Sequence, residues 1–231
     1  RWSIMSYKKN SYLVVKNAIP VDVANFVYDY FNMKRRAFIT LKETGYISKF
    51  DDDWGEYDKQ VPTAYAHYAD LAMETILDIL TPKMSKLTKL DLTPTYSYAR
   101  IYGKGDILHK HTDRYSCEVS TTLNLGGDMW PICLIDKNGK HKEIKLNPSD
   151  MLIYNGCELE HWREEFQGDN CAQVFLHYND QKSKDADKNV NDRRPHLGLP
   201  AWFKKISDSG KTFLASLIFA PSSVLEVPIT V

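Results

Sequence analysis

Two metal-binding residue types stand two positions apart in the segment HKHTD, where His111 is followed by Asp113. Alternate side chains of an extended strand point to the same face, so an imidazole and a carboxylate at this spacing can reach one common atom. Imidazole nitrogens and carboxylate oxygens both bind divalent transition metals. The spacing therefore predicts a metal site at the end of a strand, with a third ligand from a distant part of the chain.

The predicted third ligand is His161, in the segment MLIYNGCELEHWREEFQG. It begins another predicted strand after a turn that would bring it back across the sheet toward His111 and Asp113. Two imidazoles and one carboxylate on one face of a metal leave the opposite positions open, as in non-haem Fe(II) oxygenases. His109 is the rival ligand, because an H-x-H pair with His111 is typical of cupin-like metal sites.

The elements that must position these ligands are short apolar runs separated by turn signals. The runs are rich in aromatic and β-branched residues, and clusters of Gly, Asn, Asp and Pro between them are typical of hairpins. Strands are predicted at residues 95–102, 106–112, 116–125, 131–136, 142–146, 150–154, 158–166 and 171–178. Their regular spacing favours a double-sheet jelly roll, also called a double-stranded β-helix, with a sandwich of other topology as the alternative.

Two helices are predicted before these strands. A strand through Val15 and a turn at Pro20 precede a helix with apolar residues near a 3.6-residue period. A second helix is predicted roughly from Thr63 to Leu80, on the basis of one apolar stripe. The fold class is therefore mainly β with flanking helices (α+β).

Residues 1–231 are predicted to form one domain, because sandwiches and barrels of this length are often undivided. Within it, residues 1–90 would supply an N-terminal strand and supporting helices, and residues 91–180 the jelly-roll catalytic core. Residues 181–194 are charged and poor in large apolar groups, which predicts a mobile loop or linker. The apolar C-terminal stretch is too short and too interrupted by prolines to span a bilayer, so a packing tail is predicted.

Composition argues against partners that are recruited by charge. Lys plus Arg and Asp plus Glu are both 30, so the formal net charge is zero and neither nucleic acid nor a membrane is indicated as a partner. The first residues contain no apolar signal-peptide core, which predicts a cytoplasmic protein. The four cysteines stand singly, without C-x-x-C spacing, and are predicted to be free, mostly buried thiols.

The motifs YSYARIYGKGDILHKHTDRYSCEVSTTLNLG, NPSDMLIYNGCELEHWREEFQG and CAQVFLHYND, taken in this order, resemble the Fe(II)/2-oxoglutarate-dependent dioxygenases, in the branch similar to prolyl 4-hydroxylases. The resemblance covers about residues 90–180, with a weaker similarity in residues 12–30. It implies that His111, Asp113 and His161 bind Fe(II), that 2-oxoglutarate and O₂ are co-substrates, and that succinate and CO₂ are released.

The reaction implied is hydroxylation of a C–H bond in a peptidyl or small-molecule substrate, with a prolyl residue as the first candidate. Two alternatives stay open from the residues alone. One is a cupin-type metalloenzyme that does not use 2-oxoglutarate and recruits His109. The other is a non-catalytic jelly-roll binding module, in which the three ligands do not meet.

The resemblance also implies a buried cation for the far carboxylate of 2-oxoglutarate. In the family this cation is commonly an Arg or Lys at the start of the last core strand, where Asn170 and Cys171 stand here. A buried carboxylate without a cation or several donors is costly. The predicted anchor is Arg163, because it lies two residues beyond His161 and so shares its strand face.

Arg100, on the strand before the H-x-D segment, is the second candidate for this anchor, since a guanidinium can grip a carboxylate with two hydrogen bonds. A surface pair of Arg163 with Glu164 or Glu165 is the structural alternative. The resemblance further aligns Tyr102 with a tyrosine that contacts the co-substrate, and it places Thr121 where another donor usually stands.

Overall fold

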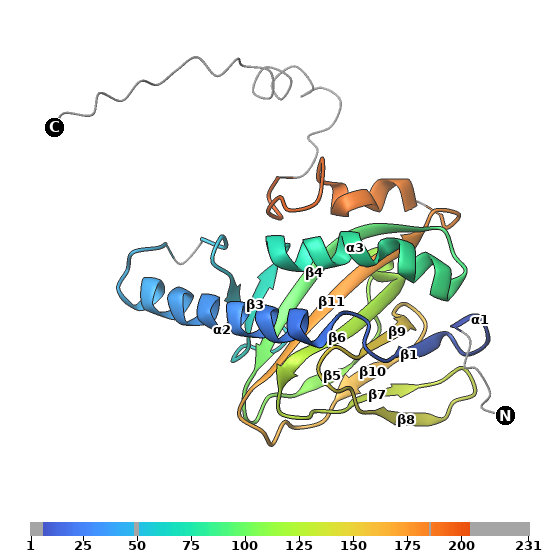
Figure 1. Cartoon of the computed structure of the whole chain (residues 1–231), viewed down its shortest axis with the longest axis horizontal. Coiled ribbons are helices and arrows are strands. Elements are labelled where there is room, and N and C mark those ends of the chain that lie inside the picture. Colours follow the sequence, from blue (N-terminus) through green and yellow to red (C-terminus); the bar gives the residue numbers. More distant parts are fainter. Residues whose placement is uncertain (1–6, 49–50, 185, 204–231) are drawn as a thin grey trace, which may run out of the picture.

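Two facing β-sheets form the centre of the computed structural model, which describes residues 7–48, 51–184 and 186–203. The larger sheet has the strand order β1-β9-β6-β11-β4-β3-β2 and the smaller one β5-β10-β7-β8 (Figure 1). The strands of the larger sheet are β1 (Tyr12–Val15), β2 (Glu56–Tyr57), β3 (Tyr65–Tyr68), β4 (Leu92–Tyr102), β6 (Val119–Gly127), β9 (Met151–Asn155) and β11 (Cys171–Asp180). Those of the smaller sheet are β5 (Leu108–His111), β7 (Ile132–Ile135), β8 (His141–Ile144) and β10 (His161–Arg163).

Neighbouring strands are antiparallel throughout the described ladders, which gives the double-stranded β-helix arrangement predicted from the sequence. Each of the eight strands predicted between residues 95 and 178 overlaps one of β4 to β11. The order β9-β6-β11-β4 brings together strands that are far apart in sequence. It is this order that places side chains from β4, β6 and β11 in one interior.

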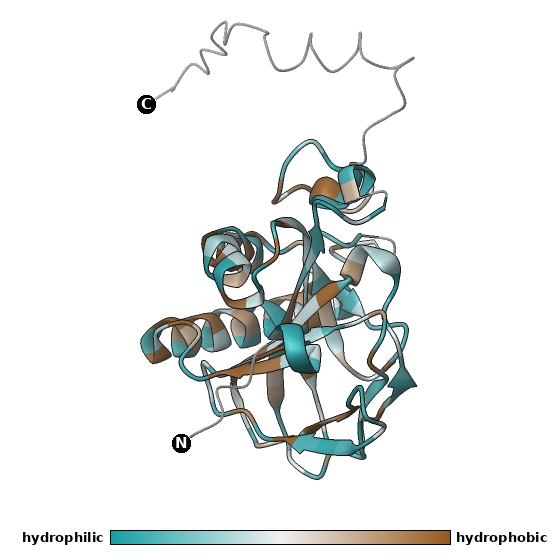
Figure 2. Cartoon of the chain, turned by 90° about the vertical axis from the view of Figure 1, so that its right-hand side faces the viewer, coloured by the Kyte–Doolittle hydropathy of each residue, from teal (hydrophilic) through white to brown (hydrophobic). Residues whose placement is uncertain are grey.

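The long helices α2 (Val21–Glu43) and α3 (Leu71–Thr88) lie on one side of the larger sheet, and the short α1 (Tyr7–Asn10) precedes β1 (Figure 1). The buried face of α2 includes Phe31 and Phe38, which pack in the same core as Leu123 and Leu125 of β6. Figure 2 shows the matching pattern, with hydrophobic stretches along interior strands and mixed polarity around the helices. One face of the larger sheet is thereby covered, and the other faces the smaller sheet.

The predicted helix from Thr63 to Leu80 is wrong in its boundaries. Residues Tyr65–Tyr68 form β3, and the helix begins at Leu71 and continues to Thr88. Asp70 fixes the start, because its carboxylate accepts hydrogen bonds from the backbone N–H groups of Ala72 at 2.9 Å and Met73 at 3.3 Å. Tyr65 and Tyr68 are three residues apart and so fit a helical stripe. The pairing of β3 with β4 and the N-cap at Asp70 nevertheless keep these two residues in a strand.

The segment predicted as a mobile loop or linker packs against the sheet instead. It contains the 3₁₀ element η2 (Ala186–Arg193), and Arg194 is fully buried. The Arg194 guanidinium donates to both carboxylate oxygens of Glu74, at 2.8 and 3.1 Å. A buried pair of this geometry holds the segment on α3. The predicted packing tail, residues 212–231, lies outside the described residues.

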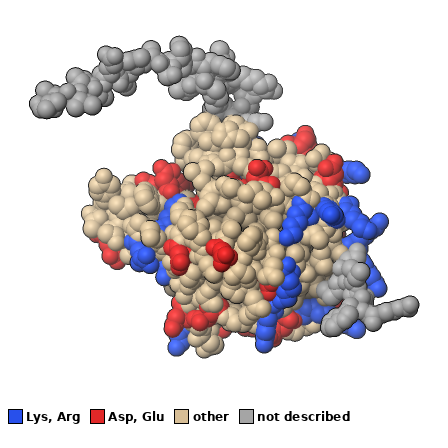
Figure 3. Space-filling model, viewed as in Figure 1, with Lys and Arg blue, Asp and Glu red and all other residues tan. Residues whose placement is uncertain are grey.

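The surface charge and the state of the cysteines are as the sequence predicts. On the face shown in Figure 3, acidic and basic side chains are both spread over the surface. Among the described helices, none combines the length and apolarity needed to cross a membrane. All four cysteines are free thiols, with Cys157 half-buried and the other three buried.

Candidate metal centre

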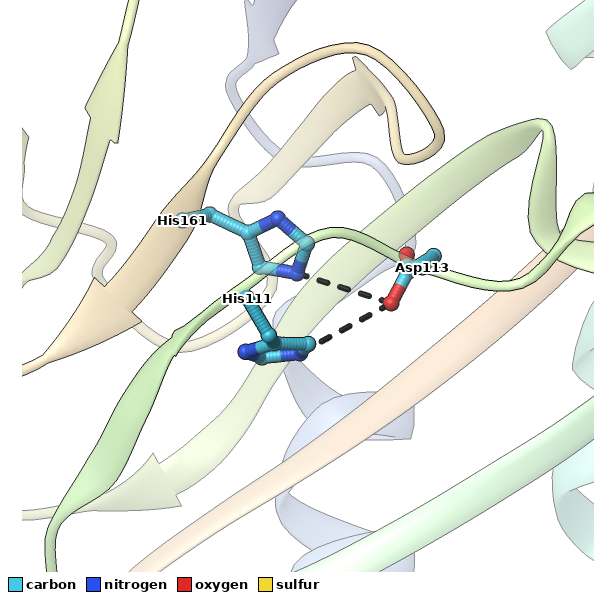
Figure 4. Close-up of side chains that lie close together, drawn as sticks. All are labelled: His111, Asp113 and His161. Atoms are coloured by element: carbon cyan, nitrogen blue, oxygen red, sulfur yellow. Dashed lines mark ion pairs between the residues drawn. The ribbon is translucent and has the colours of Figure 1, made fainter.

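Strand pairing brings the predicted ligands together. In the smaller sheet β10 runs antiparallel to β5, and His161 lies directly opposite His111. Asp113 follows the end of β5, where its backbone N–H donates to the carbonyl of Gly156 at 2.8 Å. One ligand atom from each of His111, Asp113 and His161 lies within 4.8 Å of the others (Figure 4).

Hydrogen bonds orient both imidazoles toward this point. Nδ1 of His111 lies 2.7 Å from the carbonyl of His109, and Nδ1 of His161 lies 2.9 Å from the carbonyl of Leu159. A carbonyl only accepts, so each Nδ1 must carry the proton, which leaves Nε2 as a lone-pair donor. Burial lowers the pKa of His111 and favours the neutral ring that a metal requires.

The carboxylate completes the set. Asp113 Oδ1 lies 3.7 Å from Nε2 of His111 and 3.6 Å from Nε2 of His161, while Oδ2 accepts a 2.6 Å hydrogen bond from Ser120. Burial alone would raise the pKa of Asp113, but neighbouring groups, among them the Ser120 hydroxyl that donates to Oδ2, outweigh burial and hold this pKa well below its usual range. A Cβ on Gly156 would collide with Oδ2, so glycine is needed beside the carboxylate. Two imidazole lone pairs and one ionised carboxylate are the donor set that suits Fe(II).

His109, the rival ligand, contributes through its backbone only. Its side chain is exposed, and its carbonyl accepts the hydrogen bond from His111. Lys110 is exposed as well, with its ammonium 4.5 Å from the centre of the Trp162 ring. His111 therefore enters the site, although His109, two residues before it on the same strand, stays exposed.

The three ligands line a cavity of about 280 Å³ between the sheets. Aromatic and polar side chains from the larger sheet form much of the remaining wall, among them Tyr96, Tyr98, Arg100, Phe175 and His177. A second cavity of about 450 Å³, beside α2 and β3, shares Tyr98 with the first. The metal side of the first cavity thus faces a polar, aromatic wall with room for small organic molecules.

The two arginines predicted as anchors lie in different surroundings. Arg163 is 1% exposed, so the alternative of a surface pair with Glu164 or Glu165 is wrong. Its guanidinium donates to the carbonyl of Trp130 and to Thr122 Oγ1 at 3.3 Å, and its buried Nε has no hydrogen-bond partner among the described residues. No described carboxylate forms an ion pair with it. Arg163 is therefore a buried cation without a counter-charge from the described chain.

Arg100 already has a counter-charge. Its Nε lies 2.9 Å from a carboxylate oxygen of Asp58, and it also donates to Gln60 and, at 3.2 Å, to the hydroxyl of Tyr102. Tyr102 is fully buried, in edge contact with the Trp130 ring. Asp58 belongs to the run DDDWGEYD, which the composition alone would place in solvent.

The structure also places Ser120, Thr122 and His177 around the predicted site residues. Thr121, a predicted co-substrate contact, accepts a hydrogen bond from the backbone N–H of Leu176, whereas its neighbours Ser120 and Thr122 contact Asp113 and Arg163. Alternation along β6 explains the difference, because a shift of one residue reverses the face. His177 of β11 reaches the cavity as well, through a 3.0 Å contact with Ser120.

The two facing sheets define the fold as a double-stranded β-helix that carries a His-Asp-His cluster. Solved structures, among them prolyl hydroxylases, have a similar fold. A Pseudomonas putida prolyl-4-hydroxylase matches 76% of this chain and 95% of its own, with 12% identity and a TM-score of 0.58. A Trichoplax adhaerens prolyl hydroxylase, solved in complex with a hypoxia inducible factor peptide fragment, matches 76% of this chain and 86% of its own, with 14% identity and a TM-score of 0.56.

HygX from Streptomyces hygroscopicus, solved with nickel and 2-oxoglutarate bound, matches 76% of this chain and 85% of its own, at 12% identity and a TM-score of 0.52. No protein-family model and no curated protein matches the sequence. At these identities the likeness is one of fold, and function must be argued from the site.

Proposed function

We propose that the protein is a non-haem Fe(II)- and 2-oxoglutarate-dependent dioxygenase that hydroxylates a C–H bond. The observation that carries this proposal is the meeting of His111, Asp113 and His161 within 4.8 Å, inside a fold shared with such oxygenases. When bound, Fe(II) with 2-oxoglutarate and O₂ supplies the oxidising chemistry, in which decarboxylation to succinate and CO₂ accompanies oxidation of the substrate.

The chain's own residues have three tasks in this reaction. His111 and His161 present neutral Nε2 atoms because carbonyls hold their Nδ1 protons. Asp113 presents one oxygen while Ser120 holds the other. The larger sheet covers the opposite side and separates the reacting groups from bulk water, which suppresses wasteful oxidation.

Arg163 is the proposed partner of the far carboxylate of 2-oxoglutarate. A fully buried guanidinium with an unpartnered Nε and no described carboxylate costs free energy until an anion reaches it. A dicarboxylate that chelates the metal at one end would supply that anion at the other. Arg100 is less suited, because Asp58 already neutralises it. Tyr102 accepts a hydrogen bond from Arg100.

The proposed substrate is a peptide segment or a small molecule. The peptide complex of the Trichoplax adhaerens enzyme supports a peptidyl substrate, and the resemblance to prolyl hydroxylases makes a prolyl residue the first candidate. The adjoining cavities of about 280 and 450 Å³ leave room for either a peptide segment or a small molecule.

The test is an anaerobic titration of the full-length protein with Fe(II) and then 2-oxoglutarate. Chelation of the metal by the 2-oxo acid produces a visible charge-transfer band, which we expect in the wild type. His111→Ala should abolish metal binding, and the matched variant His109→Ala should retain it. Iron binding without the band would refute 2-oxoglutarate use and favour a cupin-type enzyme, and loss of iron in His109→Ala would point the same way. Absence of any iron binding would leave a non-catalytic binding module.

A further inference from the structure

His177 is a buried histidine in the cavity that neither the metal nor the 2-oxoglutarate anchor uses. On β11 it lies opposite Ser120 of β6 and Tyr96 of β4. It is 6% exposed and lines the metal-site cavity. The Tyr96 ring packs on the imidazole with a centroid distance of 4.6 Å, which fixes the plane of the ring.

The hydroxyl of Ser120 determines which ring nitrogen of His177 carries the proton. Ser120 Oγ lies 2.6 Å from Asp113 Oδ2, 2.9 Å from the carbonyl of Cys117 and 3.0 Å from Nδ1 of His177. The carboxylate and the carbonyl can only accept, and a serine has one proton to donate. That proton is used on one of them, so the contact with His177 is a hydrogen bond only if Nδ1–H donates to Oγ.

With the proton on Nδ1, Nε2 of neutral His177 is a bare acceptor. Burial lowers the pKa of His177 to about 4, which keeps the ring neutral near pH 7. Nε2 has no hydrogen-bond partner among the described residues. It is also not completely buried, because the described atoms that are both unpartnered and without accessible surface do not include it. The nitrogen therefore keeps access to the cavity and lacks a donor from the described part of the chain.

We propose that His177 Nε2 accepts a hydrogen bond from the substrate, and that the substrate carries an O–H or N–H donor close to the carbon that reacts. This inference rests on the proposed function. A buried acceptor left unpaired is costly, so a substrate with a donor at this place is selected over one with a methyl group. The ring of a peptidyl proline has no N–H or O–H, so this inference ranks an alcohol- or amine-bearing small molecule above the prolyl residue that the resemblance favours.

Nitrogen-15 NMR of the metal-free protein tests the first step, since the shifts of Nδ1 and Nε2 report the tautomer. We expect the Nδ1–H form of His177 in the wild type and loss of this preference in Ser120→Ala. An Nε2–H form in the wild type would overturn the proposal, because Nε2 would then be a donor.

Binding of matched fragments tests the second step. Alcohols and amines are compared with their methyl analogues by ligand-observed NMR on protein loaded with Zn(II) and 2-oxoglutarate. Wild type should favour the donor member of each pair by about 3- to 10-fold, the effect of one neutral hydrogen bond. His177→Gln, which places a carbonyl oxygen near the position of Nε2, should retain the preference. His177→Asn, which keeps only the amide facing Ser120, should lose it.

The surface variant His141→Phe serves as the control and should behave as wild type, since His141 is exposed on β8. Equal binding of both members of the pairs, or binding of no donor-bearing fragment near His177, would overturn the proposal. A missing charge-transfer band in the Fe(II) and 2-oxoglutarate titration would instead refute the proposed function. The two failures are thus separable.

Discussion

Replacing Arg163 by methionine separates a ligand anchor from a structural cation. Methionine matches the length of the arginine side chain without its charge. The substitution removes two hydrogen bonds, to the Trp130 carbonyl and Thr122, but it also removes a buried charge that has no described counter-ion. An uncompensated buried ion costs several kcal/mol, which offsets the lost hydrogen bonds, so the free energy of unfolding of the ligand-free protein should stay within about 2 kcal/mol of wild type.

Whereas the stability of the ligand-free protein should change little, the affinity for 2-oxoglutarate should fall. Hydrogen bonds between a carboxylate and a guanidinium contribute about 1.5–3 kcal/mol, so Arg163→Met should weaken the binding of 2-oxoglutarate by about 10- to 150-fold. The assay is the anaerobic charge-transfer titration for affinity, together with urea denaturation of the ligand-free protein for stability. Saturating 2-oxoglutarate should stabilise the metal-loaded wild type clearly more than the variant.

Arg100→Met is the matched control, with the opposite expectation. It leaves Asp58, which is 3% exposed, without its cation, and breaking a buried pair costs about 3–5 kcal/mol. Arg163→Met with unchanged 2-oxoglutarate affinity and a loss of stability above about 3 kcal/mol would refute the anchor role. In that case Arg163 would be a structural residue.

Three other changes test the neighbouring contacts. Gly156→Ala should lower Mn(II) affinity by about 10- to 100-fold, because its Cβ displaces the Asp113 carboxylate. Gly103→Ala is the control and should bind Mn(II) as wild type does, because a Cβ there meets nothing within 4 Å. Equal affinities of the two variants would contradict the steric conflict between Gly156 and Asp113. Burial alone would raise the pKa of Asp70, but hydrogen bonding to His67 and the charge of Lys34 hold it below its usual range, so this carboxylate stabilises the fold fully above its unfolded pKa of about 4. The difference in urea stability between wild type and Asp70→Asn, about 3 kcal/mol at pH 7, should therefore shrink as the pH falls below about 4, and a constant difference would refute the pairing. Arg194→Met should cost about 3–5 kcal/mol and expose residues 186–203 to limited proteolysis, while the exposed Arg193→Met should change stability by no more than about 0.5 kcal/mol.

The clustering of His111, Asp113 and His161 could be predicted mainly from local sequence signals. His111 and Asp113 lie two residues apart at the end of a strand, and His161 begins another, so residue type and strand alternation carry most of the prediction. The strand predictions succeed for the same reason, since turn residues stand between the runs. Asp70, just before an apolar run, is a start signal that could also have placed the beginning of α3 correctly.

Residues that depend on sheet order could not be predicted in this way. Ser120 and His177 meet only because β6 pairs with β11, and no periodicity within either strand reveals that pairing. The resemblance places Thr121 near the co-substrate, and the structure shows that its neighbour Thr122 contacts Arg163. Burial of Arg163 likewise depends on tertiary packing, since its neighbours Glu164 and Glu165 are exposed.

The proposal that Arg163 is the anchor cation draws on the same sheet geometry. The resemblance placed it at the start of β11, where Cys171 stands, but Arg163 of β10 reaches the same part of the interior. Burial raises the pKa of the Cys171 thiol, and the charge of Arg163 opposes that shift. Hydrogen bonds connect them through Thr122 and Gln173. Since strands of the two facing sheets both point side chains into this space, a long guanidinium from β10 can replace a cation from β11 without moving the metal ligands.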